Sequence, residues 1–146
     1  MELELKNIFT GMEKGPEAIN DNFNNLLDSF NDTGIVTKGI SFNNGAYDWG
    51  TNQGLAQYSY YRVVTIGDVD IVTISLDLAR NKDTSSPVVF GSIPASAALK
   101  GTNNFAASPN GVQIRFNNNT FRIAPTGKLL ADTRVQLRTS YIVDHV

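Results

Sequence analysis

The N-terminal part of the chain has apolar side chains at the spacing of one helical face. The pattern predicts a helix from Gly15 to Phe30, with Pro16 suited to a first helical position and Gly15 able to cap it. Four apolar positions are separated by four, three and four residues, the a and d spacing of a coiled-coil seam. The seam residues are Ile19, Phe23, Leu26 and Phe30, and Leu27 lies beside them.

This predicted helix needs a partner surface. Its other side is rich in Asn and Asp, which are poor helix formers, and an isolated helix of about 15 residues is marginal in water. The stripe packs either on the rest of its own chain, as in most amphipathic helices, or on copies of itself. Its terminal position and the turn-rich segment 31–34 favour self-association, although two heptads are too few to fix the number of chains.

From Gly34 onward the pattern changes to short apolar runs between turn residues. The clearest pair, Tyr58 to Ile66 and Val69 to Leu78, is separated by Gly67-Asp68, which suits a type II′ hairpin. The second run alternates apolar and polar residues, which predicts one buried face and one wet face.

Two further segments carry the same alternation. Val112 to Phe116 and Thr120 to Ala124 form a second predicted hairpin around a turn of asparagines, and Arg134 to Val143 is the closing strand. With weaker runs between them, the number of predicted strands is about seven to nine. The fold class is therefore mainly β: an N-terminal helical segment, residues 1–33, followed by an antiparallel β-sandwich head, jelly-roll-like, over residues 34–146.

The composition and charge of the chain disfavour several classes of function. The net charge of −2 and the scattered basic residues disfavour a nucleic-acid partner, and no apolar run approaches the roughly 18 residues of a membrane span. The start of the chain lacks the basic and apolar regions of a secretory signal. With no cysteine, neither disulfides nor thiolate metal ligands are available.

Residues for catalysis are sparse. The one histidine, His145, is next to the chain end, where termini commonly fray, so a Ser/His/Asp relay is disfavoured. The Asp68-x-Asp70 pair fits turn chemistry better than metal binding, and no pair of carboxylates stands out for glycoside cleavage. We predict a non-enzymatic protein without cofactor or metal, leaving open calcium held by loop oxygens.

A lectin-like surface is the remaining candidate. Saccharide sites combine an aromatic platform with polar side chains that fix orientation, and the segment 43–50, predicted to be a loop, holds the only Trp of the chain. The alternative is that Trp49 and nearby tyrosines pack the sandwich or a threefold contact. Arg115 and Arg122 are expected to oppose each other on the solvent side of their hairpin, where they either bind a phosphate-bearing glycan or form a solvated pair. The candidate saccharide ligands are Tyr47, Asp48, Trp49, Tyr58, Tyr60, Arg62, Arg115 and Arg122.

A resemblance adds to these observations. The segment from Ile8 to Leu26, IFTGMEKGPEAINDNFNNL, is similar to the N-terminal segment of baseplate and receptor-binding proteins of siphophages that infect Gram-positive bacteria. It covers about one seventh of the chain. The matching residues are Gly11, Met12, Lys14, Gly15, Ala18, Ile19, Asn20 and Asp21.

The resemblance implies a homotrimer in which Ile19, Phe23, Leu26 and Phe30 form a helical bundle that plugs into another baseplate or tail protein. It also implies a place in the virion, after synthesis in the host cytoplasm, and heads that bind host cell-wall saccharide. The chain departs from one common layout of the family, since no repetitive β-prism neck fits between Asn31 and Tyr58. A structural connector that binds another phage protein, or a cell-wall hydrolase, are the alternatives.

Overall fold

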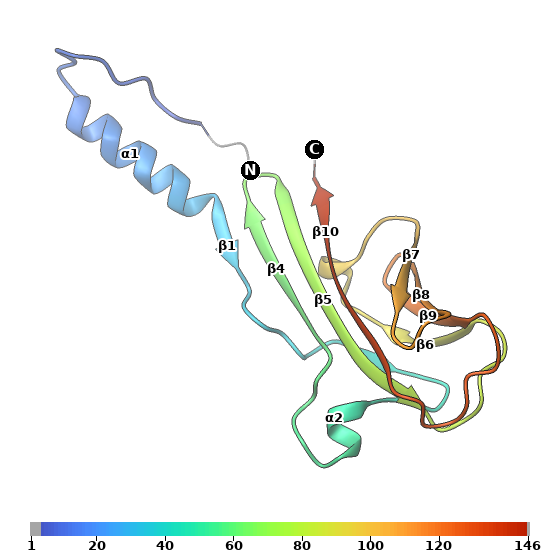
Figure 1. The fold of residues 1–146 in the computed structure, drawn as a ribbon. Helices are drawn as coiled ribbons and strands as arrows, with labels where there is room; N and C mark the ends of the chain where they lie inside the picture. The colour runs from blue at the N-terminus through green and yellow to red at the C-terminus, as the bar shows by residue number, and fades with distance from the viewer. Residues whose placement is uncertain (1–3, 146) are drawn as a thin grey trace.

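The computed structural model describes residues 4–145, in which a helical arm projects from a mainly β head (Figure 1). Helix α1 spans Gly15–Asp28, and the segment before it runs back alongside the helix. Asn22 exchanges two hydrogen bonds with the backbone of Lys6, at 2.6 and 2.8 Å, and the Asn25 amide donates to the Glu4 carbonyl at 2.9 Å. The polar side of α1 therefore holds the leading segment, and residues 4–28 form one arm.

The helix ends two residues earlier than the sequence pattern predicts. Ser29 caps α1 through its backbone N–H, which donates to the Asn25 carbonyl at 3.0 Å, and Phe30 begins strand β1 (Phe30–Asp32). The assignment of Phe30 to the helix was wrong because Phe30 pairs with Ile66, at the end of the predicted hairpin. A free strand edge there offers backbone hydrogen bonds that one more helical turn would forgo.

Ten strands form two antiparallel sheets within the described residues. In the first sheet the order is β1, β4, β5, β10, with β3 paired to the far part of β5; in the second it is β2, β6, β9, β8, β7. The jelly-roll-like connectivity stays a prediction. Bounds in the first sheet are β3 Ala46–Asp48, β4 Tyr60–Ile66, β5 Val69–Arg80 and β10 Val135–Asp144. Those in the second are β2 Ser41–Phe42, β6 Val88–Ser92, β7 Thr102–Ala107, β8 Val112–Asn117 and β9 Thr120–Pro125.

The core lies between the inner faces of the two sheets, as the alternation in the sequence predicted. Ile74 and Leu76 of β5 are at most 1% exposed, and they belong to the same apolar cluster as residues of the second sheet. Both hairpins are confirmed, and Gly67 has a positive φ of 60° at the first turn position, as a type II′ turn requires. The largest fully buried side chains are Phe90, Phe116 and Phe121.

Three segments were not predicted correctly. The stretch 43–50 is not a plain loop, because it contains β3 and the start of the short helix α2, Trp49–Asn52. Strand β7 lies in a segment that carries no clear apolar alternation. Strand β1 belongs to the first sheet although it lies within the segment assigned to the helical attachment region.

The region 95–97 is a single 3₁₀ turn. Within residues 4–145, no helix has the length and apolar character that a membrane crossing requires.

An ion pair fastens β1 to β4, and it gives a pH prediction. Arg62 Nε donates to Asp32 Oδ1 at 2.9 Å, and a second contact joins the same two groups. This hydrogen bond, together with that from the Gly34 N–H, lowers the pKa of Asp32 to about 2. Because the folded pKa lies below the ordinary value of 3.8, the pair stabilises the fold above about pH 4 and loses this effect as pH falls toward 2.

We therefore expect the stability advantage of the wild type over Asp32→Asn to shrink between pH 5 and pH 2. Urea unfolding at a series of pH values measures it, and Asp21→Asn on the arm serves as the control. An advantage that stays constant across this range would contradict the assignment.

Candidate functional site

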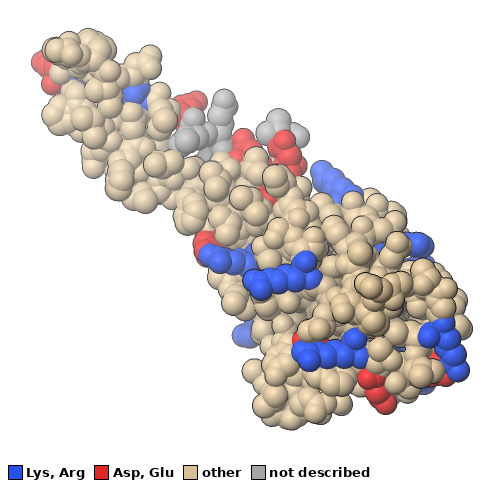
Figure 2. Space-filling model, in the orientation of Figure 1, with Lys and Arg blue, Asp and Glu red and all other residues tan. Residues whose placement is uncertain are grey.

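The apolar stripe of the arm is exposed along its whole length. Its five members are 50–59% exposed, whereas the buried residues of α1 are only Gly15 and Ala18. The arm also carries few charged atoms on the visible face, while Lys and Arg gather over the head (Figure 2). The stripe therefore does not pack against the rest of its own chain, which was one of the two alternatives drawn from the sequence. The members are Ile19, Phe23, Leu26, Leu27 and Phe30.

A cluster of aromatic and polar side chains lies at the other end of the first sheet. The Arg134 guanidinium carbon is 5.4 Å from the centre of the Trp49 ring and 6.0 Å from that of Tyr58. These distances are those of cation–π contacts, each worth about 0.5–1 kcal/mol at exposed sites. We call the cluster the Trp49 platform; it consists of Trp49, Tyr58, Asp77, Arg134 and Gln136.

Asp77 fixes the guanidinium in place. Arg134 donates from Nε at 2.8 Å and from its terminal nitrogen at 2.6 Å to the two oxygens of Asp77, and the Gln136 amide donates to the same carboxylate at 3.2 Å. The hydrogen bond to Asp77 raises the pKa of Arg134, so the guanidinium keeps its charge. The platform thus combines two aromatic side chains, a fixed cation and an amide on one surface, which is the composition that saccharide sites use.

Asp48 serves as a structural clamp beneath this platform. It is 2% exposed, and its carboxylate accepts backbone N–H bonds from Thr51 at 3.1 Å, Tyr58 at 3.0 Å and Ser59 at 2.8 Å. Those bonds start helix α2, which carries Trp49, and hold Tyr58 beside it. Asp48 is therefore not available to a ligand, although its residue type suggested one.

The remaining candidate ligands do not converge on the platform. Tyr60 is half-buried on the same outer face, while Arg62 is occupied by Asp32. The Tyr47 hydroxyl donates to Asp132 at 2.8 Å, and desolvation together with this bond raises the pKa of Tyr47 to about 12. Tyr47 therefore stays neutral and serves to anchor the 132 turn.

The two arginines of the second sheet lie apart from the platform. Arg115 and Arg122 are directly opposed in the β8–β9 register, as the sequence predicted. Arg115 donates from Nε to the side-chain oxygen Oδ1 of Asn104 at 2.9 Å, so its partner is a neutral side chain of β7. Arg122 is exposed. This pair belongs to another surface from Trp49 and Tyr58.

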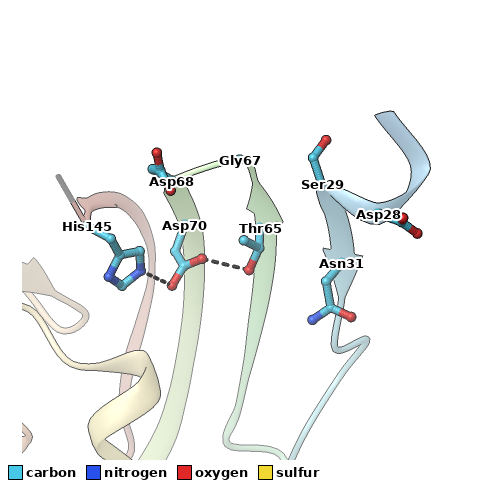
Figure 3. Close-up of a pocket in the computed structure, with 8 residues that line it drawn as sticks. All are labelled: Asp28, Ser29, Asn31, Thr65, Gly67, Asp68, Asp70 and His145. Carbon is cyan, nitrogen blue, oxygen red and sulfur yellow. Dashed lines mark hydrogen bonds and ion pairs between the residues drawn. The ribbon is translucent and has the colours of Figure 1, made fainter. Parts of the chain in front are cut away.

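A pocket of about 380 Å³ lies where the arm joins the head (Figure 3). Asp70 stands between Thr65 and His145 in its wall, accepting from Thr65 Oγ1 at 2.7 Å and contacting His145 Nε2 at 2.6 Å. Burial alone would raise the pKa of Asp70, but these two partners outweigh it and the pKa is lowered.

The three side chains in the wall of this pocket are not arranged as a nucleophilic relay. A nucleophilic relay needs the imidazole between hydroxyl and carboxylate, whereas here the carboxylate lies between the other two. His145 also donates its backbone N–H to the Asp68 carbonyl at 2.9 Å, so this residue is held against the β4–β5 turn. Among residues 4–145 no group of three or more His, Cys, Asp and Glu side chains is arranged to hold a metal ion.

Trp49 and Tyr58 were predicted from the sequence as candidate ligands, whereas the polar side chains that join them in the platform were not. The sequence pattern placed Asp77, Arg134 and Gln136 only on the solvent-exposed faces of their strands. Their contact depends on the pairing of Gln136 with Asp77 between β10 and β5. Nothing local signals a contact between strands so far apart in the sequence.

A scan against models of known protein families found no match to the chain, and a search of curated proteins found none either.

Proposed function

We propose that this chain is the protomer of a homotrimeric attachment protein of a phage tail tip or baseplate. In this proposal the arms of three copies pack through Ile19, Phe23, Leu26 and Phe30, and the heads bind host cell-wall saccharide. The observation that carries it is the exposed apolar stripe on a helix too short to be stable alone. The sequence resemblance of the arm supports the phage assignment.

The position of the Trp49 platform is consistent with this role. The arm joins the first sheet at the β4–β5 turn, where the Gly67 N–H donates to the Ser29 carbonyl at 2.8 Å. The platform lies at the other end of β5, near Asp48 and Leu78, about 30 Å away at the rise of an extended strand. An arm anchored in the particle would thus direct the platform outward.

A shallow platform suits weak binding by each head. The Tyr58 side chain is 38% exposed, and Trp49 is half-buried, so a sugar ring would meet part of each aromatic group. Three linked sites still give firm attachment, because the second and third contacts are effectively intramolecular and can raise avidity by about 10²–10⁴. Trimer formation and saccharide recognition therefore belong to one proposal.

Adsorption of the pure protein to cell walls of Gram-positive bacteria tests this function. We expect Trp49→Ala to weaken adsorption at least about tenfold, since buried aromatic anchors carry most of the energy of an interface. Arg122→Ala, an exposed candidate on the other sheet, is the matched control and should adsorb like the wild type. Both variants must melt at the wild-type temperature for the comparison to hold.

Three outcomes would count against the proposal. If no wall preparation from any susceptible strain is bound, the alternative of a structural connector between phage proteins takes its place. If walls are bound but Trp49→Ala adsorbs normally, the saccharide site lies elsewhere on the head. Release of soluble sugars from the same walls during incubation would instead indicate a hydrolase.

A further inference from the structure

The outer face of the first sheet carries an apolar cluster beside the arm. Ile66 of β4, Ile71 of β5 and Ile142 of β10 are 48%, 39% and 66% exposed. The strand register makes them neighbours. Ile71 of β5 pairs with Val64 of β4 on one side and with Ile142 of β10 on the other. Ile66 pairs with Val69, which precedes Ile71 by two residues on β5. Three strands thus contribute one continuous apolar surface, which we call the isoleucine face: Val64, Ile66, Ile71 and Ile142.

The isoleucine face is continuous with the stripe of the arm. Phe30 is the last member of that stripe and pairs directly with Ile66 in the β1–β4 register. Phe30 is itself 54% exposed, and no charged side chain separates it from Ile66. The junction is held by the Gly67 to Ser29 hydrogen bond and by the Asp32–Arg62 pair. An association that buries the end of the stripe therefore brings the isoleucine face to the same contact.

The area of the stripe alone is too small for a stable assembly. A side chain of this size that is half exposed leaves on the order of 100 Å² of surface, so five such residues offer roughly 500 Å². Stable interfaces bury about 800 Å² on each partner. The isoleucine face supplies a further apolar area of roughly the missing size, and an exposed patch of that extent usually marks an interface.

We propose that the isoleucine face packs against the same face of a second copy of this chain, extending the oligomer contact from the helical bundle onto the sheet. The inference rests on the proposed self-association and specifies a second interface region for it. A second copy is the occupant because the isoleucine face continues the stripe through Phe30 and supplies the area that the stripe alone lacks for a stable contact.

A double substitution in the isoleucine face tests this inference. Ile71→Ser combined with Ile142→Ser should raise the dissociation constant of the oligomer at least tenfold, as measured by sedimentation over a range of protein concentrations. The control pair is Thr73→Ala with Ser140→Ala, two residues further along the same strands, whose hydroxyls contact each other at 2.9 Å. This control should leave the dissociation constant within about twofold of the wild type.

The absence of cysteine in the chain allows a second, independent measurement. Ile142→Cys should form covalent dimers on mild oxidation, whereas Thr126→Cys, exposed after β9 of the second sheet, should not. A wild-type trimer whose association is unchanged in the double variant, and whose Ile142→Cys form stays unlinked, would overturn this inference while leaving the arm contact intact. A wild-type chain that sediments singly would overturn both.

Discussion

Phe23→Asp is expected to convert the assembled protein into single chains. Phe23 lies in the middle of the stripe and is 59% exposed in the isolated chain, so the substitution does not disturb the head. In a three-helix bundle it would place three carboxylates in an apolar seam, where an unpaired charge is strongly disfavoured. Loss of multivalency should then lower adsorption to cell walls by about 10²–10⁴-fold, although each head keeps its platform.

A matched variant distinguishes the effect of a charge within the apolar seam from the effect of adding a charge anywhere on the helix. Asn24→Asp adds the same carboxylate one residue further on, to the polar side of α1, and should leave both assembly and adsorption unchanged. Sedimentation gives the mass of each variant and a wall-binding assay gives its adsorption. A Phe23→Asp protein that keeps the wild-type mass would show that the stripe is not the contact.

Asp48→Ala is expected to cause the largest loss of stability among single changes near the platform. The substitution leaves three backbone N–H groups, those of Thr51, Tyr58 and Ser59, without their carboxylate. An unsatisfied buried donor costs about 1–3 kcal/mol, so we expect the free energy of unfolding to fall by about 3 kcal/mol or more. Saccharide binding should fall as well, because α2 and Tyr58 lose their common anchor.

Chemical denaturation measures this change, and Asp28→Ala, at an exposed residue where the arm joins the head, is the control. Removing an exposed carboxylate there should alter stability by no more than about 0.5 kcal/mol. Asp48→Asn is informative too, since it keeps the shape but loses the charge and one acceptor oxygen. Equal stability of Asp48→Ala and the wild type would contradict the role of this residue as a clamp.

The local sequence pattern was sufficient to predict the strands that have one solvent-exposed and one buried face. The alternation around Ile74 and Leu76 gave the correct face of β5, and Gly67-Asp68 gave the correct turn. The same reasoning placed Arg115 opposite Arg122. In each case the physical signal lies within a few residues, because alternation and turn geometry act over that range.

Contacts between distant segments could not be predicted in this way. Phe30 continues the helical spacing of the stripe, yet it forms a strand because the edge of β4 is available beside it. Asp77 and Arg134 meet only through the pairing of β5 with β10. Asp48 was taken for a surface ligand because nothing in its neighbourhood shows that three backbone groups converge on it. Such outcomes depend on tertiary structure rather than on local propensity.

In the proposed assembly, the apolar stripe of the arm is covered only when other copies of the chain pack against it. Sedimentation equilibrium of the pure wild-type protein at micromolar concentration tests it most directly. We expect a mass of three chains that falls toward one on dilution, with the isoleucine face contributing to the affinity. A single-chain mass at every concentration tested would contradict it and the attachment role that depends on it.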